Sequence, residues 1–188
     1  MTRIAPLQAP YSPEVQESFD RIMPPGAPPL VLFRTLAGHE RAWRKFRAGS
    51  LLDRGPLSLR DRELVIDRTC ALAGCEYEWG VHVAIFAERA RLDAARVRAT
   101  VGEGSQAECW TPAERALLRA VEALHASATL EEDAFAELAT HYDEAQILEI
   151  LLLCGFYRTV AYLANGLDLP LEPGAPRFED AARGEAGA

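Results

Sequence analysis

The sequence lacks a hydrophobic run long enough to cross a membrane, and it lacks an apolar stretch near its beginning. The longest strongly apolar run covers residues 150–153 and extends to 156, whereas a membrane-spanning helix needs about 20 apolar residues. Residues 1–6 do not resemble the apolar core of a secretory signal. We therefore expect a cytoplasmic protein with no membrane partner.

Positive charge is also scarce. The chain has 20 basic and 28 acidic residues, which gives a formal net charge of -8. A nucleic-acid-binding domain usually carries a basic patch, but here the basic residues, all arginine except Lys45, are mostly interleaved with acidic ones, as in residues 60–63. This pattern predicts a solvated surface of mixed charge and argues against a nucleic-acid partner.

The pattern of alternating apolar and polar residues that is typical of β-strands is missing as well. Alanine, leucine, arginine and glutamate are abundant, and these residues favour helices. A chain of 188 residues forms one domain and buries roughly 70% of the surface that its unfolded form exposes. The sequence predicts an all-α fold.

Helix caps and breakers divide the chain into three parts. We expect a proline-rich N-terminal arm with short helices over 1–57, a helical core over 58–168, and a loosely structured tail over 169–188. Ser58 predicts a helix start, Gly74 a helix end, and Thr111 a capping box with Glu114. Helices are predicted at about 13–22, 30–47, 59–73, 75–90, 93–100, 112–126, 131–141 and 147–164.

The residues that could carry chemistry lie after Gly74. Cys75, Glu78, Trp79 and His82 are spaced i, i+3, i+4 and i+7, so on a helix they share one face. A thiol, a carboxyl and an imidazole on one face are the components of a proton relay. The start of a helix favours a cysteine thiolate, whereas nearby glutamates disfavour it, so the direction of the pKa shift at Cys75 stays open.

Two simpler readings compete with a proton relay. The cysteine could be a core residue, the glutamate a helix cap and the histidine a surface residue. Alternatively, Cys75, Glu78 and His82 could contact a zinc ion, although helical zinc sites usually pair histidines four residues apart. We expect no metal and no cofactor.

The spacing around this segment resembles the signature of the carboxymuconolactone decarboxylase family, which includes the alkylhydroperoxidase D (AhpD)-like proteins. Glu63 is followed by eleven residues, then Cys75, and His82 follows Glu78 in the family's spacing. The resemblance is strongest over 58–100 and weaker up to Gly166. It implies an AhpD-like helical bundle with a helical hairpin at the site, and a homo-oligomer, commonly a trimer or hexamer and less often a dimer.

The sequence departs from the family's peroxidase members at one position, because Glu78 replaces the second cysteine of their Cys-x-x-Cys pair. Cys70 could replace that partner, but an unbroken helix would hold its Cα about 8 Å from that of Cys75, beyond the limit of about 7 Å for a disulfide. The break at Gly74 could shorten or lengthen this separation. We expect Cys70 and Cys154 to be core residues and Cys109 to be inert.

Two enzymatic mechanisms remain, and a non-catalytic oligomeric binding protein is the third possibility. In the favoured one, Cys75 reduces a peroxide, the acidic and histidine side chains relay protons, and an external thiol restores the cysteine. In the other, Glu63, Glu78 and His82 act as acid and base on a small organic acid or lactone, whose charge Arg62 or Arg68 would bind. Tyr77 and Trp79 flank the site and are the candidate substrate-binding residues, whereas packing in the core is the default expectation for both.

Overall fold

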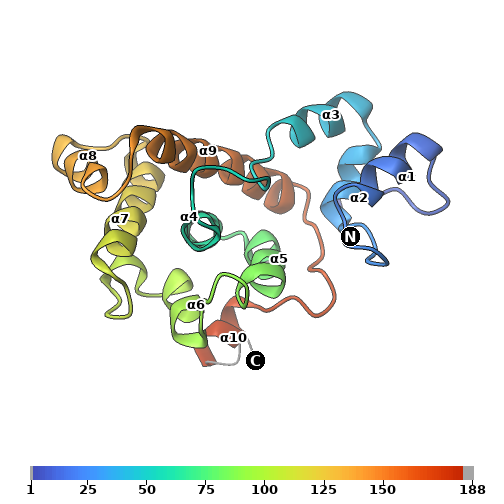
Figure 1. Cartoon of the computed structure of the whole chain (residues 1–188). Helices are drawn as coiled ribbons and strands as arrows, with labels where there is room; N and C mark the ends of the chain where they lie inside the picture. Colours follow the sequence, from blue (N-terminus) through green and yellow to red (C-terminus); the bar gives the residue numbers. More distant parts are fainter. Residues whose placement is uncertain (1, 184–188) are drawn as a thin grey trace.

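The computed structural model describes residues 2–183, and within that range all regular structure is helical (Figure 1). The predicted all-α fold is therefore confirmed. The elements, in chain order, are α1 (Pro13–Asp20), α2 (Val31–Ala37), α3 (Glu40–Ala48), α4 (Leu59–Leu72), α5 (Glu76–Phe86), α6 (Ala94–Val101), the 3-10 helix η1 (Gly104–Gln106), α7 (Pro112–Ser127), α8 (Glu132–Ala139), α9 (Glu144–Gly166) and α10 (Phe178–Arg183).

Helix α4 forms the centre of the molecule and is surrounded by α5, α6, α7 and α9 (Figure 1). Nine consecutive residues, 62–70, are buried, so this helix has no solvent-facing side over that stretch. Four of the nine carry charged side chains, and a buried charged group is stable only if it finds a partner. The polar contacts of α4 therefore set much of the architecture.

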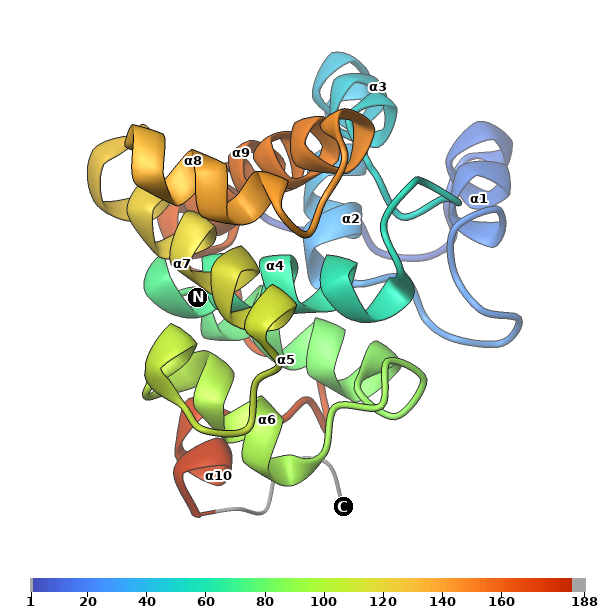
Figure 2. The same ribbon diagram turned by 60° about the vertical axis from the view of Figure 1, so that its left-hand side comes forward.

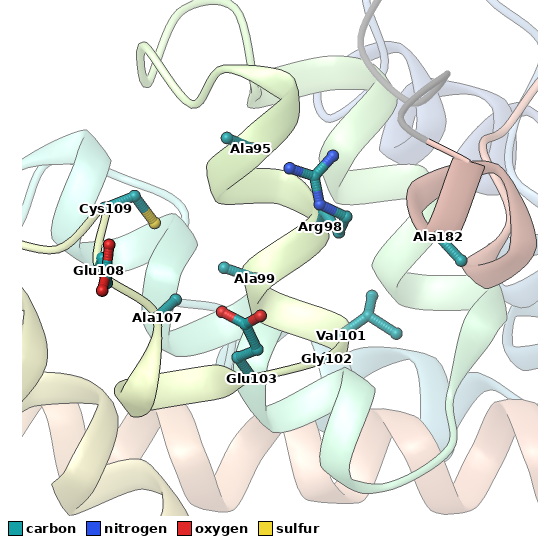
Figure 3. A pocket seen from close by; sticks show the side chains of 10 residues that line it. All are labelled: Ala95, Arg98, Ala99, Val101, Gly102, Glu103, Ala107, Glu108, Cys109 and Ala182. Atoms are coloured by element: carbon teal, nitrogen blue, oxygen red, sulfur yellow. The ribbon is translucent and has the colours of Figure 1, made fainter.

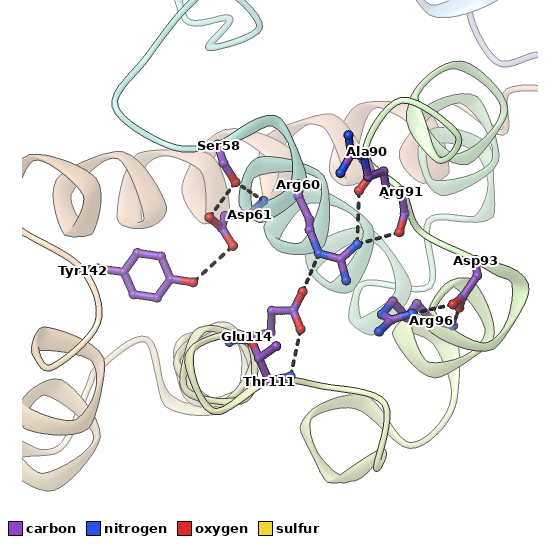
Figure 4. Close-up of polar contacts among 10 residues, drawn as sticks. All are labelled: Ser58, Arg60, Asp61, Ala90, Arg91, Asp93, Arg96, Thr111, Glu114 and Tyr142. Atoms are coloured by element: carbon purple, nitrogen blue, oxygen red, sulfur yellow. Dashed lines mark hydrogen bonds and ion pairs between the residues drawn. The ribbon is translucent and has the colours of Figure 1, made fainter.

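The beginning of α4 is fixed by polar contacts to three other parts of the chain (Figure 4). Arg60 binds Glu114 of α7 and donates to the backbone carbonyl oxygens of residues 90 and 91, which follow α5. The Tyr142 hydroxyl donates to Asp61 at 3.2 Å. Glu114 also completes the predicted capping box with Thr111, since each side chain binds the other's backbone N–H. One glutamate thus caps α7 and joins it to α4.

The turn between α4 and α5 is a Schellman motif, which places Cys75. The N–H of Gly74 donates to the carbonyl oxygen of Ala71 at 3.0 Å, and the N–H of Cys75 donates to that of Cys70 at 2.8 Å. Gly74 has φ = 62°, the left-handed conformation that such a turn requires. The prediction of a helix end at Gly74 is confirmed, and Cys75 becomes the N-cap of α5.

The N-terminal arm packs onto the core rather than extending from it. The helical pattern predicted over 30–47 is interrupted, because Gly38 ends α2 and His39 is extended before α3 begins. Phe46 of α3 contacts Phe156 of α9, with ring centroids 5.3 Å apart. The arm therefore belongs to the same hydrophobic core as the central helices.

The C-terminal segment is more ordered, up to Arg183, than its composition predicts; residues 184–188 lie outside the described range. Helix α10 lies against α6 (Figure 2), and Ala181 is buried. The Phe178 ring packs on Trp79, and its N–H donates to Glu76 at 2.8 Å. The prolines and glycine at 173–176 predict the irregular link correctly, but these apolar contacts beyond it hold the last helix in place.

Helix α9 is long and apolar enough to cross a membrane by length and composition, with a mean hydropathy of 1.6 over an 18-residue window. The sequence prediction considered only uninterrupted apolar runs and did not identify it. In the structure α9 packs along α4 and contacts α5, α7 and α8. Those are the contacts of a core helix of a globular domain.

The Schellman turn yields a stability prediction. We expect Gly74→Ala to lower the free energy of unfolding by about 1–2 kcal/mol, because alanine is strained at positive φ. An added Cβ meets no atom within 4 Å at this position, so the cost comes from the backbone alone. Urea unfolding measures the difference.

Gly166→Ala is the matched control for this prediction. Gly166 is the last residue of α9, an added Cβ there also meets no atom within 4 Å, and its φ is not in the positive range. We expect this variant to change stability by less than about 0.5 kcal/mol. Equal effects of the two substitutions would contradict the backbone argument.

Candidate proton-relay site in the α4–α5 hairpin

The predicted acidic and histidine residues meet between α4 and α5. Nδ1 of His82 lies 2.7 Å from Oε2 of Glu63, and Nε2 of His82 lies 3.5 Å from Oε1 of Glu78. The other oxygen of Glu63 accepts from Arg62, 2.8 Å from one guanidinium nitrogen and 2.9 Å from another. All four side chains are buried, and Cys75 lies at the start of the same helix as Glu78 and His82. The structure therefore assembles the predicted site.

The hairpin explains why residues far apart in sequence meet here. The Schellman turn reverses the chain after α4, so a side chain on α4 can face α5. Glu78 and His82 are one turn apart on α5, which places them on the same side of that helix. Glu63 and His82 are thereby joined across the two helices, with His82 between two carboxyl groups.

His82 is cationic at neutral pH in this arrangement. Burial acts to lower the pKa of its imidazole, but the hydrogen bond and charge of Glu63, and those of Glu78, outweigh burial and raise the pKa to about 10. The imidazole and the ring of Tyr157 pack in a T-shaped arrangement, with ring centroids 5.0 Å apart. Both ring nitrogens therefore carry protons, and the ring can donate one.

Cys75 is a neutral thiol at rest. Burial raises the pKa of this thiol to about 11; the backbone N–H of Glu78 acts in the opposite direction, and the charge of Glu78 adds to the increase. The sequence left the direction of the pKa shift at Cys75 open. Burial sets this direction, because the side chain has 0% exposure. A base must remove its proton before it can act as a nucleophile.

A free acceptor is available for that proton. Among the described residues, Oε2 of Glu78 is buried and has no hydrogen-bond partner. Unpaired buried oxygens are costly and occur most often where a proton or ligand is received. Glu78 therefore joins His82 through one oxygen and keeps the other for a proton.

Two further residues belong to the site and were not predicted. Asp67 lies one turn after Glu63 on α4, is fully buried, and has one carboxyl oxygen without a partner in the described range. Burial, and then the charge of Glu63, raises the pKa of Asp67, although His82 acts to lower it. The i, i+4 spacing of the two acids was a usable signal. Tyr157, on α9, gave no local signal.

The two arginines proposed as substrate contacts are both bound to protein groups. Arg62 is at the site, but it binds Glu63 and the carbonyl oxygen of Leu52. Arg68 faces another part of the core, where it binds Glu122 and the carbonyl oxygen of Thr100. Neither guanidinium is free to bind an anionic substrate.

The contacts of Tyr77 and Trp79 do not place them in a substrate pocket. The Tyr77 hydroxyl accepts from the N–H of Leu32 at 3.0 Å and donates to Glu172. Trp79 is fully buried and donates from Nε1 to Thr100 Oγ1 at 3.0 Å. Both side chains thus hold α5 against other segments, as the core-packing expectation has it.

The other cysteines differ from one another in environment. Cys70 is fully buried, as predicted, whereas Cys154, predicted as a core residue, is only half-buried. Its sulfur accepts from the Thr69 hydroxyl at 3.8 Å, and it lines a cavity of about 340 Å³. Cys109 is also half-buried and lines a cavity of about 400 Å³ with Arg98 and Glu103 (Figure 3).

The relay is closed to solvent in the single chain. Five surface cavities of about 270–840 Å³ are lined by other residues and not by Glu63, Cys75, Glu78 or His82. Within residues 2–183, no group of three or more His, Cys, Asp or Glu side chains is arranged to hold a metal ion.

Solved structures of other proteins share this architecture. An uncharacterized peroxidase-related protein from Silicibacter sp. TM1040 has a TM-score of 0.80 at 18% identity, covering 94% of this chain and 95% of that one. The alkylhydroperoxidase AhpD core of a peroxidase-related protein from Ralstonia eutropha JMP134 also has a TM-score of 0.80, at 20% identity over 98% and 96%. The debrominase Bmp8, as a cysteine-to-alanine variant with 2,3,4-tribromopyrrole, has a TM-score of 0.76 at 20% identity over 92% and 93%.

These similarities define the fold class: the protein is an AhpD-like all-α protein. Residues 37–123, which contain the whole relay, match the model of the carboxymuconolactone decarboxylase family. The resemblance inferred from the spacing of Glu63, Cys75 and His82 is confirmed. A search of curated protein sequences finds no match.

The different environments of His82, which is buried, and His125, which is half-buried, lead to a pH prediction. We expect the His82 imidazole to remain protonated through pH 8, whereas His125 titrates below its ordinary range because burial, Arg158 and Arg68 lower its pKa. Histidine ¹H–¹⁵N spectra recorded between pH 5 and 11 measure both. A neutral His82 at pH 7 would contradict the proposed charge state.

The raised pKa of His82 also affects the stability of the protein. Because the pKa of His82 in the folded state, about 10, exceeds its unfolded value of about 6.5, protonation stabilises the fold. This contribution is complete below about pH 6.5 and is lost as the pH rises toward the folded pKa.

Proposed function

We propose that the protein reduces a small peroxide through Cys75, with Glu78 as the base and His82 as the acid. The buried Glu78 carboxyl carries this proposal, because one oxygen contacts His82 and the other has no partner in the described part of the chain. Its charge also acts on Cys75. A carboxyl placed between a neutral thiol and an imidazolium can take a proton from the first and receive one from the second.

The reaction begins with proton transfer from the Cys75 thiol to Glu78. The thiolate attacks one peroxide oxygen, the O–O bond breaks, and the cysteine becomes a sulfenic acid. The departing oxygen takes a proton from His82, which Glu78 then restores, so water or an alcohol leaves. Glu63 holds the imidazole in place at Nδ1 throughout, and an external thiol reduces the sulfenic acid.

The closed surroundings favour a peroxide over an organic acid. A small organic acid would need a cavity and a free cation, but Arg62 and Arg68 are both paired. A peroxide needs only access to the sulfur, which a small opening movement provides. The peroxidase-related names of two structures with this fold, and the cysteine-to-alanine variant used with the debrominase, support thiol chemistry.

A cytoplasmic location fits this proposal. Reduced thiols are abundant in the cytoplasm, and they would supply the electrons that each turnover consumes. The partners that we propose are thus a small peroxide and an external thiol reductant.

Trapping of the sulfenic acid tests the proposal. After brief exposure to hydrogen peroxide with a sulfenic-acid trap, we expect mass spectrometry to find the adduct at Cys75 and to find none there in Cys75→Ser. If Cys75 remains a free thiol after excess peroxide, the proposal is wrong and a screen of small organic acids becomes the next experiment.

The Glu78→Gln variant distinguishes two roles of this carboxyl: a base that takes the Cys75 proton, and a charge that only raises the pKa of the thiol. Removing the negative charge alone would favour the Cys75 thiolate and speed its oxidation, because that charge raises the pKa of the thiol. Removing a base would instead slow oxidation by about 10²-fold or more. We expect the slower rate, and a faster one would exclude Glu78 as the base.

We also propose that the chain assembles as a homo-oligomer through α9, as the family resemblance implies. Leu148, Leu152 and Tyr162 of this helix are exposed by 60% or more, and a second copy would bury them. Light scattering coupled to gel filtration should give a multiple of the 20.7 kDa chain mass.

A charged substitution in the same helix tests this assembly. We expect Leu152→Glu to lower the measured mass, because a buried unpaired charge at an interface is unfavourable. Phe135→Glu on α8 is the control, since Phe135 is also an exposed large apolar residue but lies on another helix. A monomeric wild-type chain would contradict the proposal.

A further inference from the structure

The Schellman turn brings two cysteines together. The N–H of Cys75 lies 2.8 Å from the carbonyl oxygen of Cys70. Covalent geometry places a Cα about 2.4 Å from its own carbonyl oxygen and about 1.5 Å from its own nitrogen, so the two Cα atoms lie within about 6.7 Å of each other. Disulfide-bonded cysteines have Cα atoms about 4.4–6.8 Å apart. The turn therefore makes the separation shorter than the value of about 8 Å expected for an unbroken helix.

The side chains share one buried environment as well. Cys70 and Cys75 both have 0% exposure and belong to the same hydrophobic cluster. They occupy the two positions of a Schellman motif whose side chains commonly touch across the turn. Burial raises the pKa of Cys70, and the charges of Glu78 and then Cys75 add to this increase. The second thiol therefore lies in the same buried environment as Cys75 and within the influence of the Glu78 charge.

We propose that Cys70 and Cys75 form a redox-active dithiol, in which Cys70 is the resolving thiol for Cys75. This inference rests on the proposed peroxide reduction and adds the step that follows it. It assigns a Cys-x-x-x-x-Cys pair, joined across the turn, to a chain in which Glu78 occupies the position of the second cysteine of Cys-x-x-Cys.

The chemistry balances without an additional oxidant. Glu78 accepts the Cys70 proton, and the Cys70 sulfur attacks the Cys75 sulfenic acid. The S–OH bond breaks, an S–S bond forms, and the hydroxyl group leaves as water with the proton that Glu78 returns. The peroxide is the oxidant for the whole sequence, and the external thiol reductant restores both cysteines by thiol–disulfide exchange.

A direct test oxidises the purified wild-type protein with diamide, which makes disulfides without peroxide chemistry. After alkylation of the remaining thiols, we expect peptide mapping to find one intramolecular disulfide, between Cys70 and Cys75, with the loss of two hydrogen atoms per chain. Cys154→Ser should keep this disulfide and is the matched control, because Cys154 contacts the neighbour of Cys70, Thr69. If Cys70 and Cys75 are both still alkylated, the inference is wrong.

A second experiment, with peroxide, tests the resolving role of Cys70 separately from the proposed function. In Cys70→Ala and Cys70→Ser we expect severalfold more trapped sulfenic acid at Cys75 than in wild type, because nothing resolves it. If trapping is equal in wild type and both variants, peroxide reduction stands and the resolving role of Cys70 is wrong. If diamide links the pair but peroxide oxidises neither cysteine, the dithiol stands and the proposed substrate is wrong.

Discussion

The burial of α4 on every side is the constraint on which the rest of the structure depends. A helix with no solvent-facing side over nine residues would normally be apolar, but this stretch contains Arg62, Glu63, Asp67 and Arg68. Each charge must be compensated within the protein. The resulting pairs join α4 to α5 through His82 and to α7 through Glu122. The same requirement that organises the core thus also builds the relay.

Some of the buried polar groups have hydrogen-bond partners for all their atoms and others do not. This difference distinguishes structural residues from candidate reactive ones. Arg68 has both a carboxylate and a carbonyl partner, so it is a structural residue. Glu78 and Asp67 each keep a buried oxygen without a partner in the described range. Such groups carry a cost in stability that a proton, a buried water or a reactant can relieve. The unsatisfied oxygens therefore mark where the fold has been shaped for a reaction.

Much of this could be predicted from the sequence, and the failures have physical causes. Caps at Ser58, Gly74 and Thr111 gave helix boundaries within a few residues, because cap chemistry is local. Helical spacing gave Glu78 and His82, since a helical repeat fixes which residues share a face, and the resemblance to the family's motif gave Glu63.

Contacts between distant segments could not be predicted from local sequence patterns. The partners of Tyr77 and Arg68, and the approach of Tyr157 to His82, depend on how helices cross rather than on any local pattern. The protonation state of Cys75 was open for the same reason. It is set by burial, and burial is a property of the whole fold.

The contacts of Tyr77 affect the order in which the site forms. Tyr77 binds Leu32 and Glu172, and Glu172 also accepts from the N–H of Val31, so α5 is held by both ends of the chain. During synthesis on a ribosome the contact with Glu172 forms only after residue 172 has been added to the chain. Until then α5 lacks this support. In the peroxide reduction that we propose, the Cys75 thiol would therefore be accessible to oxidants before the fold is complete.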